Sequence, residues 1–153
     1  MSEPMPIDVT QQTRATLEAM HRTIKANGFL AQADFFAERH INYGFPSTRE
    51  QTRAVLQDIA ETFPDIALEP IQVMFDGEWA IGHYWCSGTH KGMARHPYVH
   101  YGLLAGVEPT GRSMRVSHVH IFRIQNGQIT EHCGTRDDVA MTRQLGLTVQ
   151  VGG

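Results

Sequence analysis

Histidine is the residue type in this sequence best suited to chemistry, and it is unevenly distributed. Of the nine histidines, seven lie between His83 and His132. His118 and His120 are two residues apart, so on a β-strand their side chains point to the same face. An imidazole beside a carboxylate can take a proton from a carbon acid and return it, because its pKa lies near neutrality. This half of the sequence therefore predicts acid–base chemistry at a carbon next to a carbonyl group.

Asp137 is the carboxylate that the strand pattern brings to these histidines. Asn126-Gly127 separates two runs of alternating apolar residues, which is typical of a two-residue hairpin turn. Residues paired across such a turn share a face, and the more apolar face is the one that an antiparallel sheet covers. That face comprises Val116, His118, His120, Phe122, Ile124, Ile129, Glu131, Cys133, Thr135 and Asp137. We expect Asp137 to be the general acid and base, with His118 or His120 as its catalytic partner, and His132 to point away.

Further residues are expected to contact a hydrophobic small-molecule substrate in the same pocket. The substrate-binding candidates are Tyr43, Tyr84, Phe122, Cys133, His90 and His100. His21 and His40 are expected at the surface or in an interface. The pair of histidines at 118 and 120 is also compatible with a metal site of the cupin type, but such a site needs a glutamate shortly afterwards, which residues 121–125 lack. We expect neither a metal ion nor a cofactor.

Helical periodicity marks the first part of the chain and its end. Apolar residues at helical spacing predict helices over residues 10–27 and 30–39. A capping box that begins at Ser47 predicts the start of another helix, which ends before Pro64. A last helix is expected over residues 137–145. These helices flank a region of different character.

The region between these helices is predicted to form β-strands. From Ile66 onward, short alternating segments are separated by turn residues, with a hairpin turn at Asp76-Gly77 and a further strand at 99–105. Helices followed by an antiparallel sheet are typical of the α+β class. The sequence therefore predicts a single α+β domain over residues 10–153, behind a flexible lead-in of residues 1–9.

Composition excludes several classes of function. The chain has 153 residues, of which 41% are hydrophobic, which suffices for one domain core. Its 13 Lys and Arg against 16 Asp and Glu give a net charge of -3, and the cations are spread along the chain, so no nucleic-acid partner is expected. The two cysteines form no framework, which fits a reducing, cytoplasmic setting. No apolar run approaches the ~20 residues of a membrane helix, so no membrane partner is expected either.

Several short motifs occur together in a fixed order along the chain. They are Thr62-Phe63-Pro64-Asp65, Gly88-Thr89-His90-Lys91-Gly92, Pro109-Thr110-Gly111-Arg112 and the run from Ile121 to His132, followed by Asp137 and Gln144-Leu145-Gly146. In this order they resemble the SnoaL-like polyketide cyclase family over about residues 29–147. The resemblance implies the nuclear-transport-factor-2-like fold, a cone of curved antiparallel sheet closed by N-terminal helices, and a homodimer. It also implies an intramolecular aldol closure without a cofactor, in which the acid–base aspartate is Asp137 and the inward histidine is His118 or His120.

Three departures from the family pattern fall near the expected ligand. Cys133 stands where the family usually has Trp, Tyr43 stands where His is common, and the segment Met93 to Glu108 is longer than usual. We therefore expect either a polyketide cyclase or an isomerase of a hydrophobic carbonyl compound. Two alternatives also stay open. One is an epoxide hydrolase of the limonene type. Part of its catalytic set could be supplied by Asn42, Tyr43, Arg136 and Asp137. The other is a module that binds a small ligand without turning it over.

Overall fold

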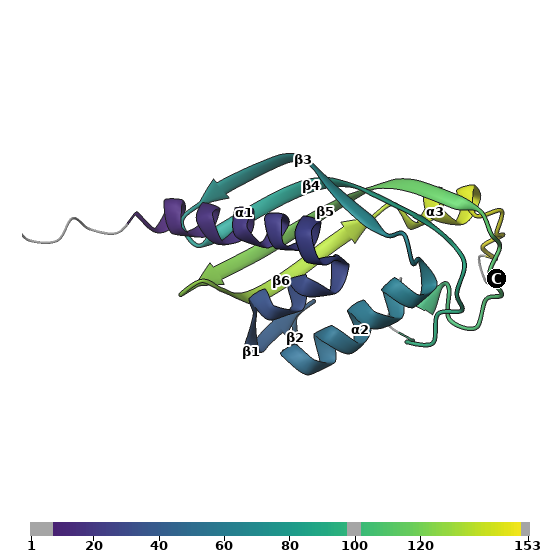
Figure 1. Cartoon of the computed structure of the whole chain (residues 1–153), viewed down its shortest axis with the longest axis horizontal. Coiled ribbons are helices and arrows are strands. Elements are labelled where there is room, and N and C mark those ends of the chain that lie inside the picture. Colours follow the sequence, from purple (N-terminus) through teal and green to yellow (C-terminus); the bar gives the residue numbers. More distant parts are fainter. Residues whose placement is uncertain (1–7, 98–101, 151–153) are drawn as a thin grey trace, which may run out of the picture.

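A computed structural model describes residues 8–97 and 102–150 of the chain, and it contains a curved six-stranded sheet with helices on one side (Figure 1). The elements are α1 (Val9–Asn27), the 3₁₀ helix η1 (Phe29–Phe35), β1 (Phe36–Asn42), β2 (Phe45–Thr48), α2 (Arg49–Thr62), β3 (Ala67–Asp76), β4 (Trp79–Thr89), β5 (Ser113–Gln125), β6 (Gln128–Arg136) and α3 (Asp138–Gln144). The strand order is β2-β1-β6-β5-β4-β3, antiparallel except for the parallel pair β1 and β6. The predicted α+β class is confirmed.

The first helix forms as its pattern predicts, whereas the second does not. Asp8 caps α1 by accepting from the amide of Thr10, and the chain leaves the helix at Gly28, whose φ of 98° favours glycine. The helix predicted over residues 30–39 is wrong. Only a 3₁₀ turn forms there, and from Phe36 the chain is strand β1. A short apolar run is ambiguous between helix and strand, and pairing with both β2 and β6 decides in favour of the strand.

Two turn and cap positions differ by one residue from the predicted ones. The capping box of α2 uses Thr48, not Ser47, and its partner is Gln51. The turn between β3 and β4 consists of residues 77–78, because Asp76 already pairs with Trp79. The described part of the predicted strand at 99–105 is a turn with an isolated bridge, and residues 98–101 lie outside the described chain.

The hairpin of β5 and β6 forms at the predicted turn, but β6 contains one extra residue. The predicted pair Ile124 and Ile129 is present, while the next pair is Arg123 with Glu131, which leaves Thr130 as a β-bulge. Because side chains alternate along a strand, one extra residue reverses the face of every residue that follows it. All predicted pairs beyond Ile124 are therefore wrong, and so are the faces assigned to β6 from Glu131 onward.

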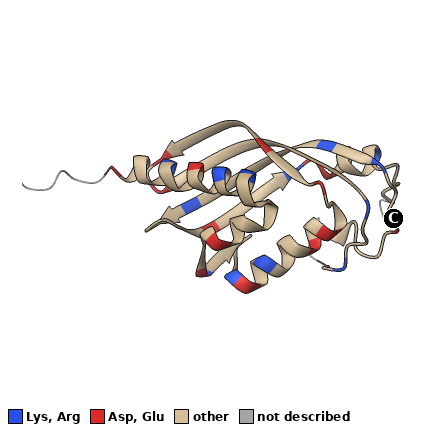
Figure 2. Cartoon of the chain, viewed as in Figure 1, with Lys and Arg blue, Asp and Glu red and all other residues tan. Residues whose placement is uncertain are grey.

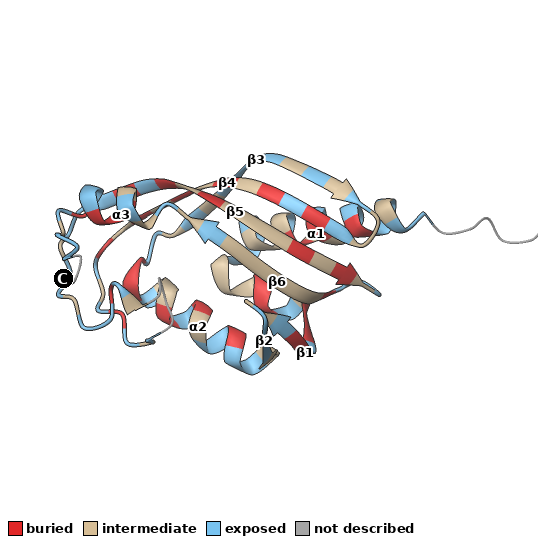
Figure 3. Cartoon of the chain, turned by 180° about the vertical axis from the view of Figure 1, so that it is seen from behind, coloured by how far each residue is buried: buried red, intermediate tan, exposed pale blue. Residues whose placement is uncertain are grey.

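The core consists of two apolar clusters at opposite ends of the sheet. One comprises Leu17, Met20, Phe36, Ala80, Tyr84, Phe122, Ile124 and Ile129; the other comprises Phe63, Cys86, Ala94, Leu104, Met114, Val116, Met141 and Leu145. Along β4, buried residues alternate with more exposed ones, as Figure 3 shows from behind the sheet, where α1 and α2 lie on the far side. In the described chain, no helix is long and apolar enough to cross a membrane.

Candidate active site

A cavity of about 700 Å³ lies between the two clusters, enclosed by the sheet, α1, η1 and α2. This volume falls in the usual range for small-molecule sites. Much of its wall is apolar, with Ile24 from α1, Leu56 and Ile59 from α2, and Leu68 from β3. Polar side chains gather on the opposite wall, which β5 and β6 form.

Three histidines on that wall form a continuous hydrogen-bonded chain. Nδ1 of His118 lies 3.3 Å from Nε2 of His120, and Nδ1 of His120 lies 3.0 Å from Nε2 of His132. Nδ1 of His132 lies 2.8 Å from Oδ1 of Asn42. Asn42 belongs to β1, and it reaches His132 because these two residues are partners in the parallel pair of β1 and β6.

Asn42 gives the histidine chain a direction. Because its Oδ1 can only accept, His132 donates from Nδ1 and, when neutral, accepts at Nε2. His120 must then donate from Nδ1 to His132, and His118 must donate from Nδ1 to Nε2 of His120. The three rings therefore share one tautomer, and a proton taken up by His120 can pass on to His132 within existing hydrogen bonds.

Burial and nearby positive charge keep the rings of His120 and His132 neutral. Burial lowers the pKa of His120 to about 4, and the positive charge of Arg136 acts in the same direction. Burial also lowers the pKa of His132 well below its usual value, helped by repulsion from His120, Arg136 and His40. A group that is neutral at pH 7 and enclosed in an apolar site can serve as a base.

Two glycines beside His120 make room for aromatic rings on the inner face of the sheet. Gly82 on β4 and Gly134 on β6 are the partners of His120 on either side. A Cβ atom at Gly134 would lie 2.7 Å from Nδ1 of His120, and one at Gly82 would collide with the ring of Tyr84. Glycine inside a strand often marks a place where another group must approach closely, and here it admits aromatic rings to the inner face.

Arg136 adds a positive charge to the same wall. It lines the cavity, pairs across the strands with His118, and its side chain is only 12% exposed. Nε of Arg136 lies 3.9 Å from Oδ1 of Asp138. A cation in a poorly solvated site can stabilise negative charge that develops on a substrate oxygen.

A tyrosine and a fourth histidine face this wall. The hydroxyl of Tyr84 lies 2.8 Å from Nε2 of His21 on α1, and the Tyr84 ring meets His120 edge-on with 5.7 Å between ring centroids. Burial raises the pKa of Tyr84 above its ordinary value and lowers that of His21. Both are therefore neutral at pH 7, and the tyrosine hydroxyl can act as a hydrogen-bond donor.

The structure brings together five of the predicted site residues. His118, His120, Tyr43, Tyr84 and Phe122 all line the cavity. Tyr43 lies between β1 and β2, and the inward placement of the other four follows from strand alternation on β4 and β5, which the bulge does not affect. Their contribution to catalysis or binding stays a prediction.

Three other predicted site residues lie elsewhere. Asp137 is exposed and caps α3, with its carboxylate accepting from the amide of Ala140 at 2.9 Å. Cys133 is the strand partner of Ile121, on the face of β5 opposite to the histidines. His90 is buried in the loop after β4, where its ring packs on Phe63. None of the three lines the cavity, so the predicted inward facing of Asp137 and Cys133 is wrong.

One predicted residue cannot be placed, and several cavity residues were missed. His100 lies outside the described residues. His132 and Arg136 were assigned to the outer face and are inside because of the bulge. His21 lines the cavity and His40 is buried within the chain, whereas both were expected at the surface or in an interface. Gly134, a glycine within a strand, was the available signal for the crowding around His120.

The histidines do not converge as metal ligands do. Both ring nitrogens of His120 are hydrogen-bonded to other histidines, so His118 and His132 lie on opposite sides of its ring. Among residues 8–97 and 102–150, no group of three or more His, Cys, Asp or Glu side chains could hold a metal ion. The epoxide hydrolase pieces are also only partly assembled: Asn42, Tyr43 and Arg136 line the cavity, but Asp137 does not.

Comparison with known proteins shows which family this protein belongs to. The family model for SnoaL-like polyketide cyclases matches residues 13–145. The chain belongs to the SnoaL-like polyketide cyclase family. No match was found among curated proteins.

Solved structures of family members and relatives share the fold at low identity. A candidate SnoaL-like polyketide cyclase from Jannaschia sp. CCS1 is similar with a TM-score of 0.73, at 18% identity over 96% of this chain and 100% of that one. TsrD from Streptomyces laurentii gives 0.71, at 22% over 88% and 98%. AclR from Streptomyces galilaeus, a candidate hydroxylase, gives 0.69, at 17% over 90% and 97%. The predicted nuclear-transport-factor-2-like fold is thereby confirmed, with one parallel strand pair in its curved sheet.

Proposed function

We propose that this SnoaL-like protein is a cofactor-independent acid–base enzyme that cyclises or isomerises a hydrophobic carbonyl compound, with the histidine chain as its proton carrier. The observation that carries the proposal is the run of hydrogen bonds from His118 through His120 and His132 to Asn42, on the wall of an otherwise largely apolar cavity. Family membership supports the reaction class, and the placement of the side chains supports the residues.

His120 is the base in this mechanism. Its contact with His118, at 3.3 Å, is longer than its contact with His132, at 3.0 Å, and is therefore the one that a substrate can replace. Nε2 of His120 then takes the proton from the carbon next to a ketone, and its Nδ1–H already points to His132. The displaced Nδ1–H of His118 donates to the substrate oxygen, and the charge of Arg136 stabilises the enolate.

The reaction balances without any other reactant. The C–H bond breaks, its proton moves to His120, and the electron pair forms an enolate. In a cyclase the enolate carbon then bonds to a second carbonyl carbon of the same molecule, and the resulting alkoxide takes the proton back. In an isomerase the proton returns to a different carbon. Asp137 has no part in either sequence.

Exchange of hydrogen for deuterium tests the first step without knowledge of the natural substrate. The native protein should accelerate exchange of the α-hydrogens of a hydrophobic ketone such as 2-tetralone in D₂O, followed by NMR. His120→Gln should reduce this acceleration by about a hundredfold or more, the usual contribution of a general base. Asp137→Asn is the matched control and should retain it. Retained exchange in a folded His120→Gln protein, or no acceleration by the native protein, would overturn the proposal.

A further inference from the structure

The charges around the cavity are strongly unequal. Three of its lining residues are cations, Arg22, Lys25 and Arg136, whereas Glu69 is the one Asp or Glu among the described residues that line it. This contrasts with the whole chain, whose net charge is -3. The histidines add no negative charge to this balance. The cavity is therefore a positive region in an acidic protein.

The single acid is already engaged. Glu69 sits at the edge of the cavity with a side chain that is 71% exposed, and its carboxylate lies 3.6 Å from the guanidinium of Arg115. Arg115 is held in turn over the ring of Trp85, with 4.3 Å from its Cζ to the ring centroid. Glu69 consequently has a partner of its own and does not balance the cations on α1.

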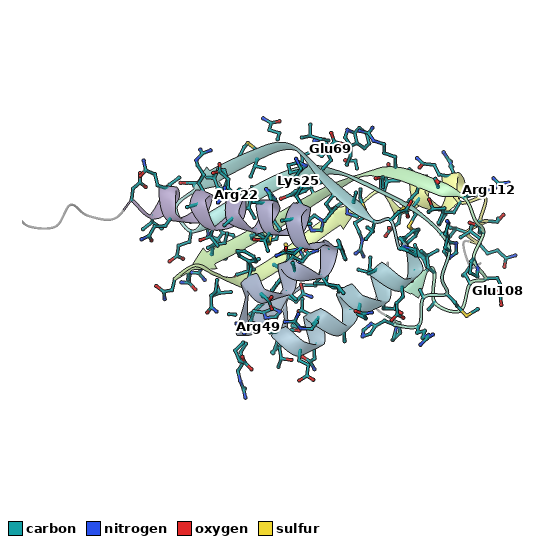
Figure 4. All side chains as sticks on the ribbon, in the orientation of Figure 1. Arg22, Lys25, Arg49, Glu69, Glu108 and Arg112 are labelled. Carbon is teal, nitrogen blue, oxygen red and sulfur yellow. The ribbon has the colours of Figure 1, made fainter. Side chains whose placement is uncertain are left out.

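The two cations on α1 have no such partner. Arg22 and Lys25 are three residues apart, so they lie on one side of the helix, and both are exposed at the edge of the cavity. Within the described residues, neither forms an ion pair, in contrast to Arg14 on the same helix, which pairs with Glu18. Figure 2 shows the positive residues along α1, and Figure 4 labels Arg22 and Lys25 beside Glu69 on β3.

We propose that the substrate of this cavity carries a carboxylate or another acidic group, which Arg22 and Lys25 bind at the mouth. The apolar body of the molecule then extends past Ile24 and Leu68 toward His120. This inference rests on the proposed function for the end of the substrate that reacts, and it adds the chemical character of the other end. Lys25 also lies in the last turn of α1, where a cation stabilises the helix, but that role does not require Arg22 to face the cavity.

Binding of an acid and its neutral amide tests this directly. Anthracene-2-carboxylate and anthracene-2-carboxamide have nearly the same shape, and their fluorescence reports binding. The native protein should bind the acid roughly three- to tenfold more tightly than the amide, the range that two partly exposed ion pairs supply. Arg22→Gln combined with Lys25→Gln should remove this preference and leave the affinity for the amide unchanged.

A second double variant serves as the matched control. Lys91→Gln combined with Arg95→Gln removes the same charge from exposed positions that do not line the cavity, and it should keep the preference. Equal binding of acid and amide by the native protein would overturn the inference, as would a preference that survives in the α1 variant. Failure of the proposed function reads differently: the native protein then binds the acid selectively but exchanges no ketone hydrogens.

Discussion

Acidification should destabilise this protein well above the range in which carboxylates titrate, because His120 and His132 are folded as neutral rings. Folding lowers the pKa of His120 from 6.5 to about 4. Between these two pH values, His120 binds a proton in the unfolded chain but not in the folded chain. Stability is fully present above pH 6.5 and is lost as the pH falls from there toward about 4. His132, whose pKa is also lowered, adds to the loss in the same window.

The size of the effect follows from the size of the shift. One pKa unit corresponds to about 1.36 kcal/mol, so His120 alone accounts for about 2 kcal/mol between pH 7.5 and pH 5 and about 3 kcal/mol at the low end. Asp65 and Glu78 have lowered pKa values because of hydrogen bonds to Thr89 and to Gln125 and Arg123. Their protonation destabilises the fold only below their ordinary values, so the interval above pH 5 belongs to the histidines.

Two measurements check this prediction. Urea unfolding at a series of pH values gives the slope of the unfolding free energy, and NMR of the histidine ring protons gives each titration. His120→Gln should reduce the slope, whereas His83→Gln, which makes the same change on a ring bonded to Ser117 outside the cavity, should keep it. If His120 and His132 titrate near pH 6.5, or if stability is level from pH 7.5 to pH 5, the neutral chain of imidazoles is refuted.

Three substitutions test other parts of the same arrangement. Gly134→Ala places a Cβ 2.7 Å from Nδ1 of His120; it should cost about 1–3 kcal/mol in urea unfolding and break the bond to His132, visible in nitrogen NMR of the rings. Asp137→Ala removes the cap of α3 and should cost about 1 kcal/mol while ketone exchange continues; lost exchange would return this aspartate to the mechanism. Asn42→Leu leaves Nδ1–H of His132 without its acceptor, so it should cost about 1–3 kcal/mol and change the tautomer of the histidine chain; an unchanged tautomer would show that Asn42 does not direct it.

Much of the fold was accessible from local pattern. The first helix has an apolar stripe and a glycine at its end, and the turn at Asn126-Gly127 has both residues at positive φ, 51° and 73°, as a tight hairpin requires. Alternation along β5 placed His118 and His120 inside. These features depend on neighbouring residues alone, and for that reason the sequence is enough to predict them.

The rest depended on contacts between distant segments. Residues 36–42 become a strand because β6 and β2 offer partners on both sides, and no pattern within the segment indicates this. The bulge at Thr130 is a single residue, yet it decides which side chains of β6 enter the cavity. The predicted pairs assumed that β5 and β6 pair regularly from the turn onward. Because of the one bulge, His132 and Arg136 face the cavity in place of Cys133 and Asp137.

That exchange alters both the strength of the base and the electrostatics of proton transfer. A carboxylate in an apolar pocket has its pKa raised, whereas burial lowers the pKa of His120 to about 4, close to that of an ordinary carboxylate. A buried carboxylate is therefore the stronger base of the two, and the two bases also differ in charge. A carboxylate becomes neutral when it takes the proton, while an imidazole becomes a cation next to the new enolate. In a poorly solvated cavity that pair attracts strongly, and His132 and Arg136, which the bulge brings inside, are placed to share the proton and to hold the enolate.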